Sequence, residues 1–325
     1  MPCKAIPSPI IYAKMADFCV KRPPGNFWAG IRDGRFFAAV SDDVITMGKK
    51  RRLFSELGPA AYAISLRKEI LKRHAKDLLG RERFARNRSQ DWLPAVVASW
   101  TGNLIKRGPG IDPVLQQNKG SNIRIACDHI DGIIVQPGET FSFWKLVGRT
   151  TPRNGFVEGR VIAGGRLVSG IGGGLCNLAN TLCLLILNSP VTITELHHHS
   201  DALAPDPNNV RVPYSAGTSV NYNAIDLRFR NDTAQPIQFH TWCEGDILHA
   251  EMRTTEEFPW TYRIVEEGHH FRKEGAKYYR VSKIYRETYD RVSGELLGRE
   301  LHWNNHSEVM FDPRLIPAEL IVPEG

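Results

Sequence analysis

The chain has 325 residues, of which 42% are hydrophobic and 24% charged, with a formal net charge of +7 at pH 7. This composition is typical of a globular protein. No apolar run approaches the roughly 20 residues that a bilayer-spanning helix needs, and the N-terminus lacks the basic start, apolar run and cleavage site of a secretory signal. We therefore expect a cytoplasmic protein, or one peripheral at the inner membrane face.

The cysteines are scattered, without a Cys-x-x-Cys pair. Such spacing argues against a zinc ribbon and against a dense disulfide scaffold. We expect reduced thiols. The six positions are Cys3, Cys19, Cys127, Cys176, Cys183 and Cys243.

The positive charge is concentrated near the N-terminus. Residues 49–88 contain 13 Lys and Arg against 4 Asp and Glu, a local charge of +9, so the rest of the chain sums to −2. Apolar residues at three- and four-residue steps predict a basic amphipathic helix over 59–79. Its simplest interpretation is a solvated surface helix, and contact with an anionic membrane through residues 49–88 is the alternative. No nucleic-acid-reading motif accompanies the charge, so no nucleic-acid partner is expected.

The remaining elements are predicted in chain order from period and turn residues. A helix is expected over 118–131. Two hairpins are expected about Gly164-Gly165 and Glu244-Asp246, and a short one about Asp33-Gly34. An apolar helix at 175–187 is followed by strands. The predicted strands are 133–135, 140–143, 161–163, 166–168, 191–196, 219–230, 236–242, 247–253, 278–287 and 295–304.

This order predicts an α+β fold, with mostly antiparallel strands around a buried helix and a basic helical segment at the N-terminus. We expect four parts. Residues 1–46 form a poorly structured extension, for which a true start at Met47 is an alternative, and residues 47–110 form the basic helical segment. Residues 111–255 form the main domain, and residues 256–325 form a β extension packed on it.

The strongest candidate for chemistry is Cys176, which follows the glycine run Gly172, Gly173 and Gly174 at the start of the apolar helix. Free N–H groups and the helix dipole at such a position favour a thiolate and stabilise negative charge beside it. The glycines and Asn177 are the expected substrate and oxyanion contacts. The structural alternative is a small buried residue that packs the helix start.

A histidine cluster supplies candidate bases. In an extended chain His197 and His199 point to one side and His198 to the other. His197 or His199 could take the thiol proton. With Asp201 the same pair could instead bind zinc, although this loose spacing is a weak metal signal. No cofactor is otherwise predicted.

Two further features have structural interpretations. Asp226 is expected to face solvent or to pair with Arg228 or Arg230. Phe141, Phe143 and Trp144 are expected to pack in the core rather than to form a sugar-binding platform.

Together these motifs resemble the VanW family over about residues 118–255. The resemblance rests on the motifs at 137–143, 155–156 and 161–167, the stretch GIGGGLCNLANTL, the sequence Glu195 to His199, and the final motif at 226–231. It implies a bacterial cell-wall context associated with vancomycin resistance. It also implies thiol acyl transfer resembling that of an L,D-transpeptidase, with Cys176 as nucleophile and His197 and His199 as the family's His-x-His pair.

This chain departs from the family pattern near the cysteine and before the first histidine. The family often has Gln after the cysteine, followed by Ser-Ser or Ser-Asn, whereas this chain has Asn177-Leu178-Ala179-Asn180; Leu196 replaces the usual Arg.

Three functions follow as hypotheses. The first is cysteine-dependent acyl transfer on a peptidoglycan peptide or precursor, the partner that the resemblance implies. The second is a non-catalytic module that binds a wall precursor or a glycopeptide. The third is a zinc hydrolase that uses the His-x-His pair.

Overall fold

The computed structural model describes residues 31–32, 35–36, 58–107, 112–163, 166–198, 201–202, 205–206, 218–222 and 224–322. These belong to two compact units, Met1–Glu69 and Ile70–Gly325. In the first unit, β1 (Ile31–Arg32) pairs antiparallel with β2 (Arg35–Phe36), which agrees with the hairpin predicted there. The rest of the predicted extension 1–46 lies outside the described residues. Among the described helices, none combines the length and apolar composition that crossing a bilayer requires.

The second unit is mixed α and β with more strand than helix, which confirms the predicted α+β class. Its helices are the end of α2 (Pro59–Leu79), α3 (Pro113–Ile130), α4 (Phe143–Val147) and α5 (Leu175–Leu187), with short 3-10 turns at Pro152–Asn154, Pro313–Leu315 and Ala318–Leu320. Its strands are β3 (Asn87–Arg88), β4 (Ala95–Asn103), β5 (Ile133–Val135), β6 (Thr140–Ser142), β7 (Glu158–Ala163), β8 (Arg166–Ile171), β9 (Thr192–Glu195), β10 (Asp201–Ala202), β11 (Arg228–Arg230), β12 (Ile237–Glu244), β13 (Ile247–Thr254), β14 (Trp260–Glu274), β15 (Lys277–Asp290), β16 (Leu296–Val309) and β17 (Ile321–Val322).

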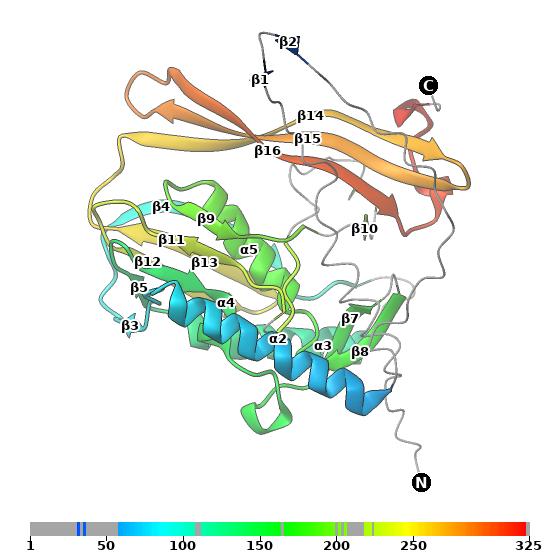
Figure 1. The fold of residues 1–325 in the computed structure, drawn as a ribbon, viewed down its shortest axis with the longest axis horizontal. Helices are drawn as coiled ribbons and strands as arrows, with labels where there is room; N and C mark the ends of the chain where they lie inside the picture. The colour runs from blue at the N-terminus through cyan, green and yellow to red at the C-terminus, as the bar shows by residue number, and fades with distance from the viewer. Residues whose placement is uncertain are drawn as a thin grey trace. The chain divides into compact units, whose positions relative to one another are not determined.

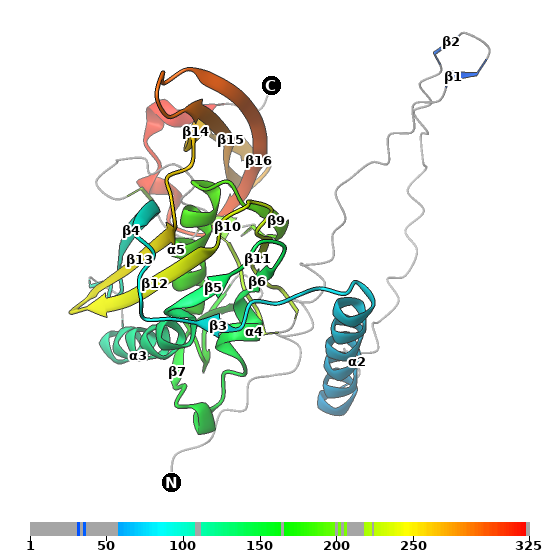
Figure 2. The ribbon, with the colours of Figure 1, turned by 90° about the vertical axis from the view of Figure 1, so that its left-hand side faces the viewer.

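Helix α5 is the centre of the core. It lies between an antiparallel sheet of order β3-β5-β12-β13-β4 and a three-stranded sheet of order β6-β11-β9 (Figures 1 and 2). Nine of its 13 residues are buried, because its sequence is apolar on nearly every face. The aromatic rings of Phe141, Phe229 and Phe239 pack together beside it. The buried Phe143 and Trp144 confirm the expectation that these aromatics are core residues.

Helix α3 begins five residues earlier than the sequence pattern predicted. Asp112 caps it, since its side chain accepts hydrogen bonds from the N–H groups of Val114 and Leu115. Pro113 occupies the first helical position, where its missing N–H costs nothing. The apolar periodicity starts only after this cap, so periodicity alone placed the start too late.

The strand predicted over 219–230 is shorter in the structure, where only Arg228–Arg230 forms β11. The preceding residues form a turn bridged by Asn221 and Ile225. Asp226 then turns inward and accepts the N–H of Leu227 and of Trp144. A side chain that bonds its neighbouring backbone in this way competes with a regular strand.

The C-terminal strands form a long, twisted sheet of order β10-β16-β15-β14-β17 (Figure 1). Strands β15 and β16 extend the runs predicted at 278–287 and 295–304. Strand β14 was not predicted, because few of its side chains are buried and a register shift between Glu267 and His270 interrupts it. Arg286 of β15 ties this sheet to α5 by donating to the carbonyl oxygens of Leu187 and Ser189 at the end of the helix.

The start of α5 rests on the hairpin of β7 and β8 through a backbone contact between two glycines. A Cβ atom added to Gly173 would lie 2.2 Å from the carbonyl carbon of Gly159, and one added to Gly159 would lie 2.5 Å from the Gly173 oxygen. Asn122 of α3 clamps the same place by donating to the carbonyls of Gly173 (2.9 Å) and Val157 (3.0 Å). Only glycine at both positions allows this approach.

We expect Gly173→Ala to destabilise the protein by about 3 kcal/mol or more, because neither backbone can retreat from the overlap. The matched control is Gly298→Ala, where a new Cβ has no atom within 4 Å. Chemical denaturation of both variants measures the difference. Equal stability of the two would contradict the proposed backbone contact.

Candidate functional site

The glycine run forms a tight turn before α5. Gly172 and Gly174 have φ angles of 76° and 100°, in the left-handed region that favours glycine. The N–H of Gly172 donates to the Val157 carbonyl and that of Gly173 to the Gly170 carbonyl. These two groups are therefore engaged within the protein. The N–H of Gly174, by contrast, donates to no group in the part of the chain that the structure describes.

Cys176 lies in the first turn of α5, as predicted, and its side chain is partly buried against the core. The thiol sulfur is 3.7 Å from the carbonyl oxygen of Val220. Burial raises the pKa of the Cys176 thiol. The expectation of a lowered pKa at the helix start is therefore wrong, since desolvation of the thiolate outweighs the backbone hydrogen bonds that lower the pKa. In the unliganded protein this group is a thiol.

A short segment connects the start of α5 with the histidines. Val220 accepts from Cys176, and the N–H of Thr218 donates to Asn180, one turn further along α5. On its other side the Ser219 N–H and the Thr218 hydroxyl both donate to the carbonyl of His197. Residues 218–220 thus bring the chain at His197 and the thiol into one neighbourhood.

The described imidazoles point in different directions. His197 Nε2 lies 3.3 Å from Glu195 Oε1, whereas the His198 ring stacks on Trp303 with centroids 4.0 Å apart. His199 lies outside the described residues, so its predicted position beside His197 stays a prediction. Asn177 directs its amide toward the carbonyl of Asn103, 3.4 Å away.

A buried ionic cluster lies beside β9, the strand that precedes the histidines. Its centre is Asp226, which is 1% exposed and accepts from the Ser142 hydroxyl (2.6 Å) and from Arg228 Nε (2.7 Å). Arg228 also donates to Asp77 on α2 (2.7 Å). The expectation that Asp226 might face solvent is wrong, and the alternative of a pair with Arg228 is confirmed. Several donors thus surround the Asp226 carboxylate in the interior and offset the cost of its burial.

Glu195 joins this cluster to His197. Arg73 of α2 donates to both of its carboxylate oxygens, at 2.8 and 2.9 Å, and the Asp226 N–H donates at 2.9 Å. Burial by itself would raise the pKa of Glu195, but the hydrogen bonds from His197 and Arg73 and the charge of Arg73 lower it to about 2. The Glu195 carboxylate is thus a fixed negative charge beside the His197 ring, which it can orient.

Lys119 contacts the glycine turn and was not among the site residues predicted from the sequence. It lies on the inward face of α3 and is 7% exposed. Burial and the nearby charges of Lys106 and Arg160 lower the pKa of its ammonium group to about 8. The signal in the sequence was its spacing, four residues before the inward-facing Ile123.

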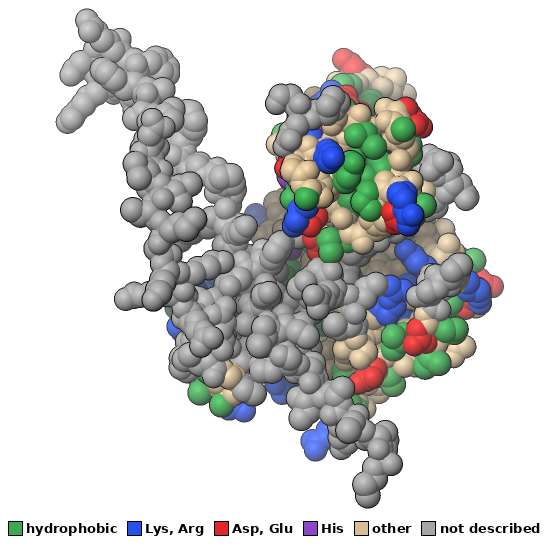
Figure 3. Space-filling model, turned by 90° about the vertical axis from the view of Figure 1, so that its right-hand side faces the viewer, with side chains coloured by type: hydrophobic (Ala, Val, Ile, Leu, Met, Phe, Trp, Pro, Cys, Tyr) green, Lys and Arg blue, Asp and Glu red, His purple; other side chains and the backbone are tan. Residues whose placement is uncertain are grey.

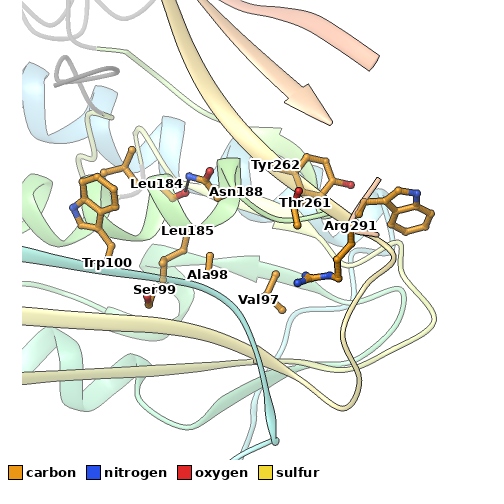
Figure 4. Close-up of a pocket in the computed structure, with 11 residues that line it drawn as sticks. Val97, Ala98, Ser99, Trp100, Leu184, Leu185, Asn188, Thr261, Tyr262 and Arg291 are labelled. Atoms are coloured by element: carbon orange, nitrogen blue, oxygen red, sulfur yellow. Dashed lines mark hydrogen bonds between the residues drawn. The ribbon is translucent and has the colours of Figure 1, made fainter. Parts of the chain in front are cut away.

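A cavity of about 290 Å³ opens between β4, the C-terminal half of α5 and β14, where Leu184, Asn188 and Arg291 are among its lining residues (Figure 4). Among the described side chains, no three His, Cys, Asp or Glu residues come close enough to bind a metal. The zinc set His197, His199 and Asp201 includes an undescribed residue and stays a prediction.

Comparison with known proteins identifies the domain that contains this site. The family model described as "VanW like protein" matches residues 118–253. The chain is similar to the VanW family over these residues. The match includes most of α3, the glycine turn, Cys176, His197 and Asp226, so the matched region contains both the turn and most of the ionic cluster.

Two curated relatives extend the VanW likeness. The chain is 25% identical to the vancomycin B-type resistance protein VanW of Enterococcus faecalis over 70% of its own length and 82% of that protein. It is 27% identical to the uncharacterized protein YoaR of Bacillus subtilis over 44% of its own length and 48% of that protein. No solved structure matches.

We expect Glu195→Gln to destabilise the protein by about 2 kcal/mol at pH 7, because it removes the carboxylate that Arg73 binds at 2.8 Å. A carboxylate with a lowered pKa stabilises the fold above its ordinary pKa of 4.5, and this contribution is lost as the pH falls toward about 2. The stability difference from the wild type should therefore shrink between pH 4.5 and 2. Urea denaturation across this range measures it, with the exposed Glu319→Gln as control. A difference that does not change with pH would contradict this role.

Proposed function

We propose that this chain carries out cysteine-dependent acyl transfer on peptidoglycan peptides or their precursors, in the vancomycin-resistance context that the name of its Enterococcus relative suggests. The observation that carries the proposal is the place of Cys176. It is in the first turn of α5, beside a glycine turn, and residues 218–220 link it to the backbone of His197. A thiol, an imidazole and free backbone donors are the groups that this chemistry needs.

The reaction begins with a protonated thiol. His197 or His199 accepts the Cys176 proton as the sulfur attacks the acyl carbonyl carbon of the donor peptide. The oxyanion lies at the start of α5, where the Gly174 N–H is the glycine donor not engaged elsewhere in the described chain. The proton then passes to the amine that leaves, and a thioester remains on Cys176. An acceptor amine or water attacks this thioester, its proton returns through the imidazole, and the thiol is regenerated.

Glu195 positions the base in this scheme. Its carboxylate lies 3.3 Å from His197 Nε2 and is held by Arg73. A charged carboxylate on one ring nitrogen fixes the tautomer and leaves the other nitrogen to accept a proton. Glu195 is thus a positioning residue, and Asp226 and Arg228 hold the strand on which it lies.

We expect a thiol-reactive β-lactam or an activated acyl donor to form a covalent adduct on Cys176. Intact-mass measurement should show one adduct on the wild type and none on Cys176→Ser, while Cys243→Ser, a control at another partly buried thiol, keeps it. The proposal fails if the folded wild type stays unmodified while alkylation after unfolding proves that Cys176 is a free thiol.

A non-catalytic binding module is the second candidate. It is favoured by the raised pKa of the Cys176 thiol and by the engagement of the His197 ring with Glu195. Under this alternative Cys176→Ser keeps the function in cells. Complete loss of function with ligand binding intact would exclude it.

Contact with an anionic membrane is part of the proposal for residues 49–88. In the described part of this segment, Leu71 and Leu78 lie seven residues apart on α2 and are 67% and 79% exposed, with Lys72 and Lys76 beside them. Apolar side chains flanked by lysines are typical of a helix that lies on a lipid surface.

The membrane contact predicts binding to phosphatidylglycerol vesicles and not to phosphatidylcholine vesicles. Replacing Leu71 and Leu78 with Ser should weaken this binding at least about fivefold, since each loses buried apolar area. Vesicle co-sedimentation measures it. Equal binding to both vesicle types, or no binding to either, would contradict a role for anionic lipid.

A further inference from the structure

Lys119, a buried lysine on α3, packs directly against the glycine turn at the start of α5. A Cβ atom added to Gly174 would meet the Cγ of Lys119 at 2.2 Å and its Cβ at 3.0 Å. The Lys119 stem therefore crosses the backbone two residues before Cys176. Such a contact is open only because Gly174, with φ at 100°, carries no side chain.

Lys119 is buried without a compensating charge. Among the described residues Lys119 takes part in no hydrogen bond or ion pair, although it is only 7% exposed. Its nearest charged influences, Lys106 and Arg160, are also positive. A buried ammonium group is costly unless an anion or several acceptors accompany it. The side-chain nitrogen of Lys119 is not fully enclosed by the protein, so a ligand can reach it from solvent.

We infer that Lys119, with Lys106 and Arg160 around it and the start of α5 beside it, forms a binding site for an anionic oxygen group, a carboxylate or a phosphate. The unpaired N–H of Gly174 and the positive end of the α5 dipole add to the same attraction. On the face of the protein shown in Figure 3, Lys and Arg side chains lie among Asp, Glu and apolar side chains. An anion here would balance the positive charge of Lys119, for which the described residues supply no partner.

The assignment of that anion to a substrate rests on the proposed function. The Lys119 stem crosses Gly174, two residues before Cys176, so a peptide whose acyl carbon reaches Cys176 could present its own carboxylate, or the phosphate of a precursor, to Lys119. Lys119 would then orient the donor and not take part in the proton transfers. Its loss is expected to raise KM and to leave kcat nearly unchanged.

The test measures binding by calorimetry with three probes: N-acetyl-dialanine as the free acid, the same peptide as its C-terminal amide, and inorganic phosphate. We expect the wild type to bind the free acid or phosphate, and the amide at least about tenfold more weakly than the free acid. Stronger binding of the free acid indicates a peptide carboxylate, and stronger binding of phosphate indicates a phosphorylated precursor. Lys119→Met, which keeps the length of the stem, should weaken binding of the preferred anion about tenfold or more.

Two controls separate a binding role from a structural one. Lys283→Met removes one positive charge at an exposed position of β15 and should leave binding unchanged. Lys119→Met should unfold at the same temperature as the wild type or a higher one, since it removes an uncompensated buried charge. A lower unfolding temperature with unchanged binding would overturn the inference in favour of a structural lysine. Failure of the wild type to bind the free acid or phosphate would overturn it as well.

The outcome is distinguishable from that of the acyl-transfer proposal. Cys176→Ser should bind the preferred anion as well as the wild type does. If no adduct forms on Cys176 but Lys119-dependent anion binding is present, acyl transfer fails and the anion site stands. If the adduct forms but Lys119→Met changes neither binding nor KM, the anion site fails and acyl transfer stands.

Discussion

The arrangement of the site depends on one close approach of two backbones. The backbones of Gly159 on β7 and Gly173 before α5 are in direct contact. Asn122 of α3 holds this contact by donating hydrogen bonds to the carbonyl oxygens of Val157 and Gly173. This contact fixes where α5 begins. It thereby fixes Cys176 in the first turn and places the stem of Lys119 across Gly174. A side chain at either glycine would move the start of the helix away from the groups that surround it.

The two ends of α5 differ in the charged groups that lie beside them. At the C-terminal end Arg286 donates to the Leu187 carbonyl, so a cation meets the negative end of the helix dipole within the chain. At the N-terminal end no described side chain caps the helix, and the nearest buried charge is the positive Lys119. Positive charge at the positive end of a helix is unfavourable by itself. This asymmetry is why we assign a ligand to the N-terminal end and a structural role to the other.

The ionic cluster stabilises β9, the strand that precedes His197. Asp226 collects donors from β6, α4 and Arg228, and Glu195 joins that cluster to Arg73 and His197. The α2 helix takes part through Arg73 and Asp77. The basic N-terminal segment is thus not only a charged surface, because Arg73 binds Glu195 on β9, next to the candidate base, and Asp77 binds Arg228 on β11.

Much of this could be predicted from the sequence. The apolar run after the glycines predicted α5 and placed Cys176 in its first turn, and alternation predicted the hairpin of β12 and β13. The sign of the shift in the Cys176 pKa could not be predicted, because it depends on how deeply the sulfur is buried. Lys119 was missed because a lysine is normally assigned to the surface. Glu195 and Asp226 acquired their roles only when α2, distant in sequence, packed against them.

The most direct test of the account is the pKa of Lys119, followed by the NMR shifts of its ¹³C-labelled side chain and assigned with Lys119→Met. The account predicts a value of about 8 in the free protein, well below the ordinary 10.5, and a rise when the free-acid peptide or phosphate is added. A value near 10.5 that does not respond to either anion would contradict it.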